Sequence, residues 1–402
     1  MHARRSPIVM NPGFAGRPLS RGAAARRRGY WLGLLLALVP AWALAQDPNA
    51  CDEPGEAPDI IVGDLPNVQR YGTQGGITAF SLGTIACNVG TCQANWVGST
   101  NQHPVIVQNL YRLKDGRFEQ IGQSWVKHGF AAFSQTFCSP DCIPAGGSHL
   151  GVNCSDPYHS GLNGEQIRMG PRSEVNAATG EFLYPFTSEG VSGDVLFKRL
   201  QVHNDDLDPA LNPGALYFAE GQYVTADDAL AGNGQNNSAY RPIVVTGSSG
   251  VFDISLTGQA VPESPALSAW EGFDPTVRGS TLEVPADGQF LIRSSSMDLG
   301  NGMWNYEYAV HNQNSNRAGG SFRVPIAAGV QVANIGFHDV DYHSGEPYDG
   351  TDWAGQVVTD AGGTAVVWAA EPFAVNPDAN ALRWGTLYNF RFDTGVPPIL
   401  GG

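Results

Sequence analysis

Short apolar runs interrupted by glycine and proline constrain the fold of this chain more than any other sequence feature. The 402 residues include 50 glycines and 27 prolines. From Gly63 onward, few stretches between these residues are long enough for an amphipathic helix. Runs of this length, bounded by turn-forming residues, are typical of β-strands. We therefore expect an all-β protein.

The first forty-five residues have the composition of an export signal. Three arginines, Arg26 to Arg28, precede an apolar run from Trp31 to Val39, and the segment ends in Ala43-Leu44-Ala45, a pattern typical of a cleavage site. This run is shorter than the roughly 20 apolar residues that a membrane-spanning helix needs. We predict that residues 1–45 are a signal peptide, that cleavage follows Ala45, and that the mature protein is secreted, either extracellular or periplasmic.

Removal of the leader makes the chain strongly acidic. The whole sequence carries a formal charge of −15, and residues 1–45 contain seven arginines and no acidic residue. The remainder has 16 basic and 38 acidic residues, a formal charge of −22. Such a surface repels phosphate backbones and anionic lipids, so nucleic acids and membranes are excluded as partners. Cations and neutral ligands, including extracellular polysaccharides, remain as candidate partners.

All six cysteines follow the predicted leader. An even number of cysteines in an exported chain indicates disulfide bonds. Proximity favours the pairs Cys87 with Cys92 and Cys138 with Cys142, leaving Cys51 with Cys154, although the sequence leaves other pairings open. A zinc site is the alternative, but these spacings fit no strong zinc motif and an oxidising compartment disfavours free thiolates.

The strand pattern predicts two β-sandwich domains, immunoglobulin-like or jelly-roll-like, because about seven strands are expected in the C-terminal part. A segment containing Pro262, Pro265 and Pro275 separates the two parts and predicts a linker. The expected organisation is a flexible N-terminal segment (46–62), an N-terminal sandwich (63–260), a linker (261–278), a C-terminal sandwich (279–396) and a tail (397–402).

Within the first domain, two hairpins and two loops are expected. Asp115 and Gly116 predict the turn of a hairpin within residues 104–133, and a second hairpin is expected around the glycine-flanked turn at 247–250. Residues 134–185 contain three cysteines and little periodicity, which predicts a long loop pinned by disulfides. A polar loop follows at 227–239. Long loops on rigid sheets are where binding sites tend to lie.

The stretch 337–353 is the chemically densest part of the chain, with two histidines, four aspartates and a glutamate. If its first half is a strand, Asp339, Asp341 and His343 share one face. Two carboxylates and an imidazole on one face can hold a transition metal. His338 lies on the opposite face and would join only if the strand bends. The alternative is a row of exposed polar residues along a sheet edge.

A second cluster of carboxylates follows His203, within residues 204–209. Hard oxygen ligands in a loop suit calcium, although a polar turn that caps a strand explains the same residues. His128, His203 and His311 form an alternative metal cluster if the fold brings them together. A single histidine on an apolar strand face is otherwise a hydrogen-bonded core residue. The implied cofactor is a divalent metal, calcium or copper, or none.

Catalytic motifs are missing from the sequence. There is no Gly-x-Ser-x-Gly elbow, and candidate acid pairs cannot be assigned without distances. Six tryptophans could stack on sugar rings if exposed, whereas burial is the default in a sandwich core: Trp96, Trp125, Trp304, Trp353, Trp368 and Trp384. We expect a secreted binding or scaffolding protein with metal-stabilised loops. The alternative is a secreted metal-dependent enzyme, an oxidoreductase or a polysaccharide-degrading enzyme, with a His/Asp site. The catalytic residues are unknown, and whether the protein is an enzyme stays open.

Three segments carry a resemblance: Gln108 to Phe130, Gly151 to Arg172, and Asn380 to Asp393. Together they resemble an uncharacterised family of exported bacterial proteins. The resemblance implies secretion and a shared two-part architecture. It implies no activity, cofactor or catalytic residue.

Overall fold

The computed structural model describes residues 47–398, and in this range the chain is all-β, as predicted. Strands account for 44% of the structure and helices for 7%. The expected signal peptide, residues 1–45, lies outside the described range. Between residues 47 and 398, no helix is both long and apolar enough to cross a membrane.

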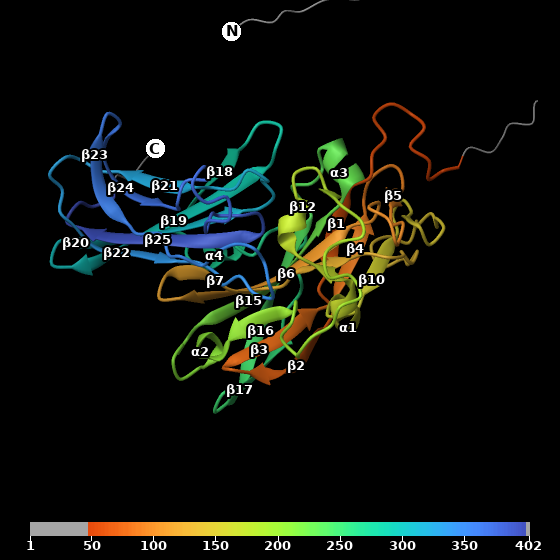
Figure 1. Ribbon diagram of the computed structural model, residues 1–402, viewed down its shortest axis with the longest axis horizontal. Coiled ribbons are helices and arrows are strands. Elements are labelled where there is room, and N and C mark those ends of the chain that lie inside the picture. Colours follow the sequence, from red (N-terminus) through yellow and green to blue (C-terminus); the bar gives the residue numbers. More distant parts are fainter. Residues whose placement is uncertain (1–46, 399–402) are drawn as a thin grey trace, which may run out of the picture. The chain divides into compact units, whose positions relative to one another are not determined.

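The N-terminal half builds the largest sheet, in which all neighbouring strands are antiparallel (Figure 1). Its order is β17-β16-β15-β6-β7-β14-β3-β2, and β8 and β11 pair beside this path. The sheet curls until its two edge strands, β17 and β2, meet. At this contact Arg70 of β2 donates from Nε to the carbonyl oxygen of Phe252 in β17 at 2.7 Å. The strands are β2 (Val68–Gln74), β3 (Ile77–Leu82), β6 (Val105–Lys114), β7 (Arg117–Gln123), β8 (Val126–His128), β11 (Met169–Gly170), β14 (Leu200–His203), β15 (Leu216–Val224), β16 (Ser238–Ser248) and β17 (Val251–Leu256).

A three-stranded sheet, β1-β4-β10, covers the inside of this curl. Ile60 and Val62 of β1 pack with Leu110 of β6 and Tyr223 of β15 in one buried apolar cluster. The sheet and the shorter elements of this half are β1 (Ile60–Asp64), β4 (Thr84–Asn88), β10 (Ser155–Tyr158), the pair β5 (Ala94–Asn95) and β9 (His149–Leu150), the pair β12 (Val175–Asn176) and β13 (Glu181–Phe182), α1 (Ser160–Asn163), η1 (Gln166–Arg168), η2 (Arg172–Glu174), α2 (Asn204–Leu207) and α3 (Ala226–Ala231).

The C-terminal half consists of two sheets around an aromatic core. The five-stranded sheet has the order β18-β19-β20-β25-β22, and the three-stranded sheet has the order β21-β24-β23. Trp368 of β24 packs on Phe390 and Phe392 of β25. The strands are β18 (Arg278–Glu283), β19 (Gln289–Gly300), β20 (Met303–Asn312), β21 (Ser321–Pro325), β22 (Val332–His338), β23 (Gln356–Asp360), β24 (Gly363–Ala369) and β25 (Thr386–Thr394). The C-terminal half thus has eight strands, close to the seven or so expected from the sequence.

Both predicted hairpins are present. β6 and β7 are joined through Asp115 and Gly116, which have φ values of 51° and 74°. β16 and β17 are joined through Ser249 and Gly250, with φ values of 56° and 77°. Glycine adopts this left-handed conformation without a steric penalty, which explains why these dipeptides mark the turns.

Residues 261–278, expected to form a linker, are packed into the protein instead. They contain α4 (Ser268–Phe273), and the side chain of Trp270 is fully buried. Trp270 belongs to an apolar cluster that includes Phe118 and Phe218 from the N-terminal half and Leu291 and Leu387 from the C-terminal half. In Figure 1, β7 accordingly lies against the sheet that contains β20, β22 and β25. The two halves share this part of the hydrophobic core.

All six cysteines form disulfides, but the predicted local pairing is wrong. The bonds join Cys51 to Cys92, Cys87 to Cys138, and Cys142 to Cys154. Antiparallel pairing of β4 with β10 places the long loop across β4, so that Cys87 meets Cys138 rather than its sequence neighbour. Two of the three bonds end in residues 134–185, which confirms that disulfides pin this segment. The segment is not one long loop, however, because it contains several short strands and helices, and β10 pairs with β4.

Candidate functional site

The stretch 337–353 does not form the predicted strand face. β22 ends at His338, so strand alternation does not apply to Asp339, Asp341 and His343. Each of the three side chains has a different protein partner. Asn380 donates to the Asp339 carboxylate, His203 donates to Asp341, and His343 donates to the backbone of Gln123. The trio therefore does not converge on one point.

His343 and His338 are both engaged by the N-terminal sheet. His343 Nε2 donates to the carbonyl oxygen of Gln123 at 2.8 Å, and Gln201 Nε2 donates to His343 Nδ1 at 3.1 Å. Burial lowers the pKa of His343 to about 4, so the neutral ring persists at physiological pH. His338 Nε2 donates to the carbonyl oxygen of Gln120 at 3.2 Å. Both imidazoles thus tie the segment after β22 to β7.

The fold does bring the two acidic stretches of the sequence together. His203 Nε2 donates to Asp341 Oδ2 at 2.8 Å, and both side chains are largely exposed. This pair borders a cavity of about 170 Å³ whose lining includes Ile77, Ile121 and Val340. An exposed polar pair of this kind contributes at most about 1 kcal/mol to stability. The cavity is small, and the pair alone defines no reaction.

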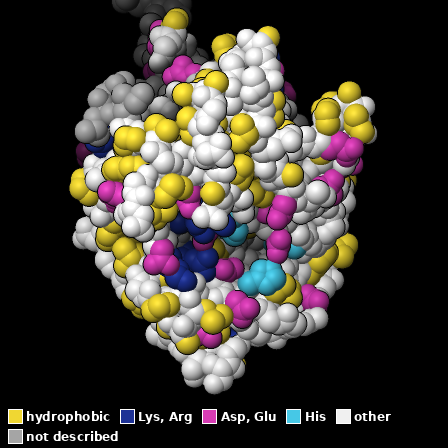
Figure 2. Space-filling model, turned by 90° about the vertical axis from the view of Figure 1, so that its left-hand side faces the viewer, with side chains coloured by type: hydrophobic (Ala, Val, Ile, Leu, Met, Phe, Trp, Pro, Cys, Tyr) yellow, Lys and Arg dark blue, Asp and Glu magenta, His cyan; other side chains and the backbone are white. Residues whose placement is uncertain are grey.

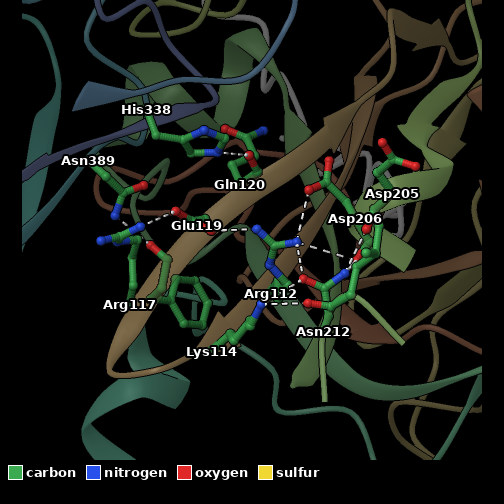
Figure 3. A network of polar contacts seen from close by, with 12 residues as sticks. Arg112, Lys114, Arg117, Glu119, Gln120, Asp205, Asp206, Asn212, His338 and Asn389 are labelled. Carbon is green, nitrogen blue, oxygen red and sulfur yellow. Dashed lines mark hydrogen bonds and ion pairs between the residues drawn. The ribbon is translucent and has the colours of Figure 1, made fainter. Parts of the chain in front are cut away.

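A network of charged side chains joins β6, β7, α2 and β20. Figure 2 shows one face on which basic, acidic and histidine side chains gather around a hollow. In Figure 3, Arg112 of β6 lies between Glu119 of β7 and Asp206 of α2, at distances of 2.7 and 2.8 Å. Arg117 Nε also contacts Glu307 of β20 at 2.8 Å. The network therefore connects α2, the large sheet and the C-terminal sheet.

Charge compensation in this network favours a structural role. Although burial alone raises the pKa of Glu119, His338 and Arg112 outweigh it and lower that pKa below its usual value. Burial raises the pKa of Glu307 to about 7 despite its contact with Arg117. Both oxygens of Glu119 accept from arginines. A carboxylate held in this way is poorly placed to exchange a proton with a substrate.

The histidines of the alternative metal cluster lie in three separate environments. His203 is on the surface with Asp341. His128 is buried and stacked on Phe186 at 3.8 Å, and it donates from Nδ1 to His103 Nε2 at 3.0 Å. His311 is fully buried near Tyr111. Within residues 47–398, no three histidine, cysteine or acidic side chains are grouped to hold a metal ion. His103, the partner of His128, carried no signal in the sequence.

A fully buried arginine anchors the contact between the halves. The guanidinium of Arg172 donates to the carbonyl oxygens of Ser124, Gln108 and Gly385 and to Asn109 Oδ1, at 2.6 to 3.2 Å. Burial lowers its pKa to about 10. The Glu346 carboxylate accepts from the backbone of Arg172 rather than from its side chain. The sequence offers no signal for this role.

The tryptophans do not form an exposed sugar-binding surface. Five of the six candidates are no more than 5% exposed, and only Trp304 is partly exposed: Trp96, Trp125, Trp353, Trp368 and Trp384 are buried. Their rings belong to the sheet cores, as is the default for a β-sandwich. The five buried tryptophans therefore cannot contact a ligand at the surface.

Three adjoining cavities form a row over the loops of both halves. The first cavity, of about 240 Å³, lies beside α3, the second, of about 490 Å³, lies beside β12 and β13, and the third, of about 510 Å³, lies in the C-terminal half. Asn101 lines both the first and the second cavity, and Asn316 lines both the second and the third. The first cavity therefore adjoins the second at Asn101, and the second adjoins the third at Asn316.

The lining of the row combines exposed amides with isolated apolar side chains. Asn101, Gln102 and Asn316 are exposed. One large apolar side chain also stands at each cavity: Leu230 is 90% exposed at the first, Leu183 81% at the second and Phe373 77% at the third. Amides both donate and accept hydrogen bonds, as hydroxyl groups do. The row therefore offers polar contacts along its length and one apolar contact in each cavity.

The sequence pointed only to parts of this row. Leu183 belongs to the predicted loop 134–185, and Leu230 belongs to the predicted polar loop 227–239. The loops that contain Asn101, Asn316 and Phe373 had no distinguishing motif. Their common signal is a local excess of asparagine and glutamine, which does not separate a binding loop from an ordinary polar turn. No protein-family model, curated protein or solved structure matches this chain.

Proposed function

We propose that this protein is a secreted binding protein and that its ligand is an extended, hydroxyl-rich polymer, an extracellular polysaccharide. The row of three cavities carries this proposal. A series of three adjoining cavities over several loops fits a chain-like ligand better than a compact one. The predicted signal peptide, the acidic composition and the three disulfides support a location outside the cytoplasm.

The chemistry of the lining supports a sugar chain. Side-chain amides such as those of Asn101 and Asn316 match hydroxyl groups, which also donate and accept. Phe373, Leu183 and Leu230 provide the apolar contacts that the C–H faces of sugar rings require. The buried, charge-compensated network around Arg112 then holds the sheets that carry these loops.

The proposal is tested by isothermal titration of the mature protein with oligosaccharides derived from glucan, xylan and mannan. The Phe373→Ala variant should bind the recognised oligosaccharide about fivefold more weakly, because a lost aromatic contact costs about 1 kcal/mol. The matched control is Phe133→Ala, since Phe133 is 65% exposed and does not line the row. Equal loss in both variants, or no binding by the wild-type protein, would contradict the proposal.

A further inference from the structure

The third cavity differs from the rest of the row in its charge. Arg317 and Arg383 line it, and Glu371 is its only acidic residue. The first cavity is lined by Asp227, and the second by Glu174 and Glu181, without lysine or arginine in either. The row therefore changes from acidic to basic along its length, in a chain whose overall charge is −15.

Arg383 is held in place before any ligand binds. Its guanidinium lies over the ring of Tyr348 at 3.6 Å. Nη2 donates to the carbonyl oxygens of Pro377 and Ala379 at 2.9 and 3.1 Å. These contacts use one terminal nitrogen and fix the plane of the group. A guanidinium fixed in this way loses little conformational entropy when it binds a carboxylate.

Arg317 adds a second positive charge without a protein counter-ion. The described part of the chain contains eight arginine–carboxylate ion pairs, and neither Arg317 nor Arg383 belongs to any of them. Asp287 accepts from the backbone nitrogen of Arg317 at 3.3 Å, which fixes the chain at this point and leaves the side chain exposed. Arg317 and Arg383 thus place two positive charges beside one cavity, and arginine is the side chain best suited to bind a carboxylate.

We propose that the third cavity binds a single carboxylate of an acidic sugar, a uronate, within an otherwise neutral polysaccharide. Phe373 contacts the face of the sugar ring, and the two arginines contact its carboxylate. The acidic side chains of the first and second cavities repel further negative charge, so a uniform polyuronate fits the row poorly. This inference rests on the proposed function and specifies the class of polysaccharide.

The test compares two matched probes by isothermal titration, an unsubstituted xylo-oligosaccharide and the same oligosaccharide with one glucuronate branch. The branched probe should bind about tenfold more tightly, because hydrogen bonds to a charged group are the stronger ones. Arg317→Gln should remove most of this difference, and higher salt should reduce it. Arg278→Gln is the control, since Arg278 is an exposed arginine of β18 that lines no part of the row.

The possible outcomes separate this inference from the proposed function. Equal binding of both probes, unchanged in Arg317→Gln, would overturn the uronate site and leave polysaccharide binding intact. Preferred binding of polygalacturonate would also overturn it, because the acidic cavities should disfavour that polymer. Binding of a glutamate-rich peptide with no binding of any oligosaccharide would overturn both proposals.

Discussion

At the scale of single residues, Arg172 is a buried side chain that hydrogen-bonds to both halves of the protein. It is buried without a carboxylate partner and donates to four oxygens drawn from both halves. Other buried polar groups in this protein, such as the two ring nitrogens of His311, lack a partner among the described residues. The stability of the contact between the halves therefore depends strongly on this one guanidinium.

We expect Arg172→Ala to destabilise the protein by roughly 3 kcal/mol or more, because several buried acceptors lose their donor together. Urea unfolding followed by tryptophan fluorescence measures this change. Arg278→Ala, which removes an exposed arginine, should change the free energy of unfolding by no more than about 0.5 kcal/mol. An equally small change in Arg172→Ala would show that water satisfies the exposed acceptors.

The pair His103 and His128 should make stability sensitive to acid. Burial lowers the pKa of His128 to about 2 and that of His103 to about 4, both below the ordinary value of 6.5. A histidine with a lowered folded-state pKa stabilises the fold fully above pH 6.5, and this contribution decreases as the pH falls toward the folded-state pKa.

The replacement His128→Phe isolates this effect, because the aromatic ring can still stack on Phe186 but does not titrate. At pH 5 a neutral histidine in the folded state contributes about 2 kcal/mol less than at pH 7.5. The stability difference between wild type and variant should therefore shrink by about that amount when urea unfolding is repeated at pH 5. A difference that does not depend on pH would show that the pKa of His128 is the same in the folded and unfolded states.

At the scale of elements, the sequence predicted strands well and their partners poorly. Asp115 and Gly116 identified a hairpin because the conformation of that turn is a local property. The cysteine pairing failed because the partner of Cys87 depends on how β10 pairs with β4, which is a long-range property. The prediction that Asp339, Asp341 and His343 share one strand face failed for a related reason. The end of β22 at His338 is fixed by its pairing with β25, which is also a long-range property.

The same distinction explains why the row of cavities could not be predicted. Asn101, Leu183, Asn316 and Phe373 come from loops that are far apart in the sequence, and each loop has an ordinary polar composition. Only the packing of the two halves places them side by side. The strand pattern thus predicts the all-β scaffold, whereas the site depends on contacts that no single segment encodes.

The disulfides should stabilise the protein according to the loops they close. Cys87 and Cys138 are 51 residues apart, and Cys142 and Cys154 are 12 apart. Restriction of the unfolded chain predicts a loss of about 4 kcal/mol for the double serine variant of the first pair and about 3 kcal/mol for the second. Urea unfolding gives the order of stability, and peptide mapping without reduction gives the pairing. Recovery of a peptide that joins Cys87 to Cys92 would contradict the structure.

At the scale of the whole molecule, the packing of α4 indicates that the two halves unfold together. Trp270 is fully buried between apolar side chains of both halves, and the links made by Arg172 and by Arg117 with Glu307 cross the same contact. Separate domains joined by a linker would instead bury little surface against each other, and each would unfold with its own transition.

Scanning calorimetry of residues 46–402 should therefore show one transition, with equal calorimetric and van't Hoff enthalpies. The Trp270→Ala variant should lower the midpoint of that transition, because the loss of a buried tryptophan costs about 3–5 kcal/mol. Two resolved transitions in the wild type would show that the halves are independent domains. If so, the row of cavities would lie between bodies free to move, and a ligand that spans it should shift both transitions upward together.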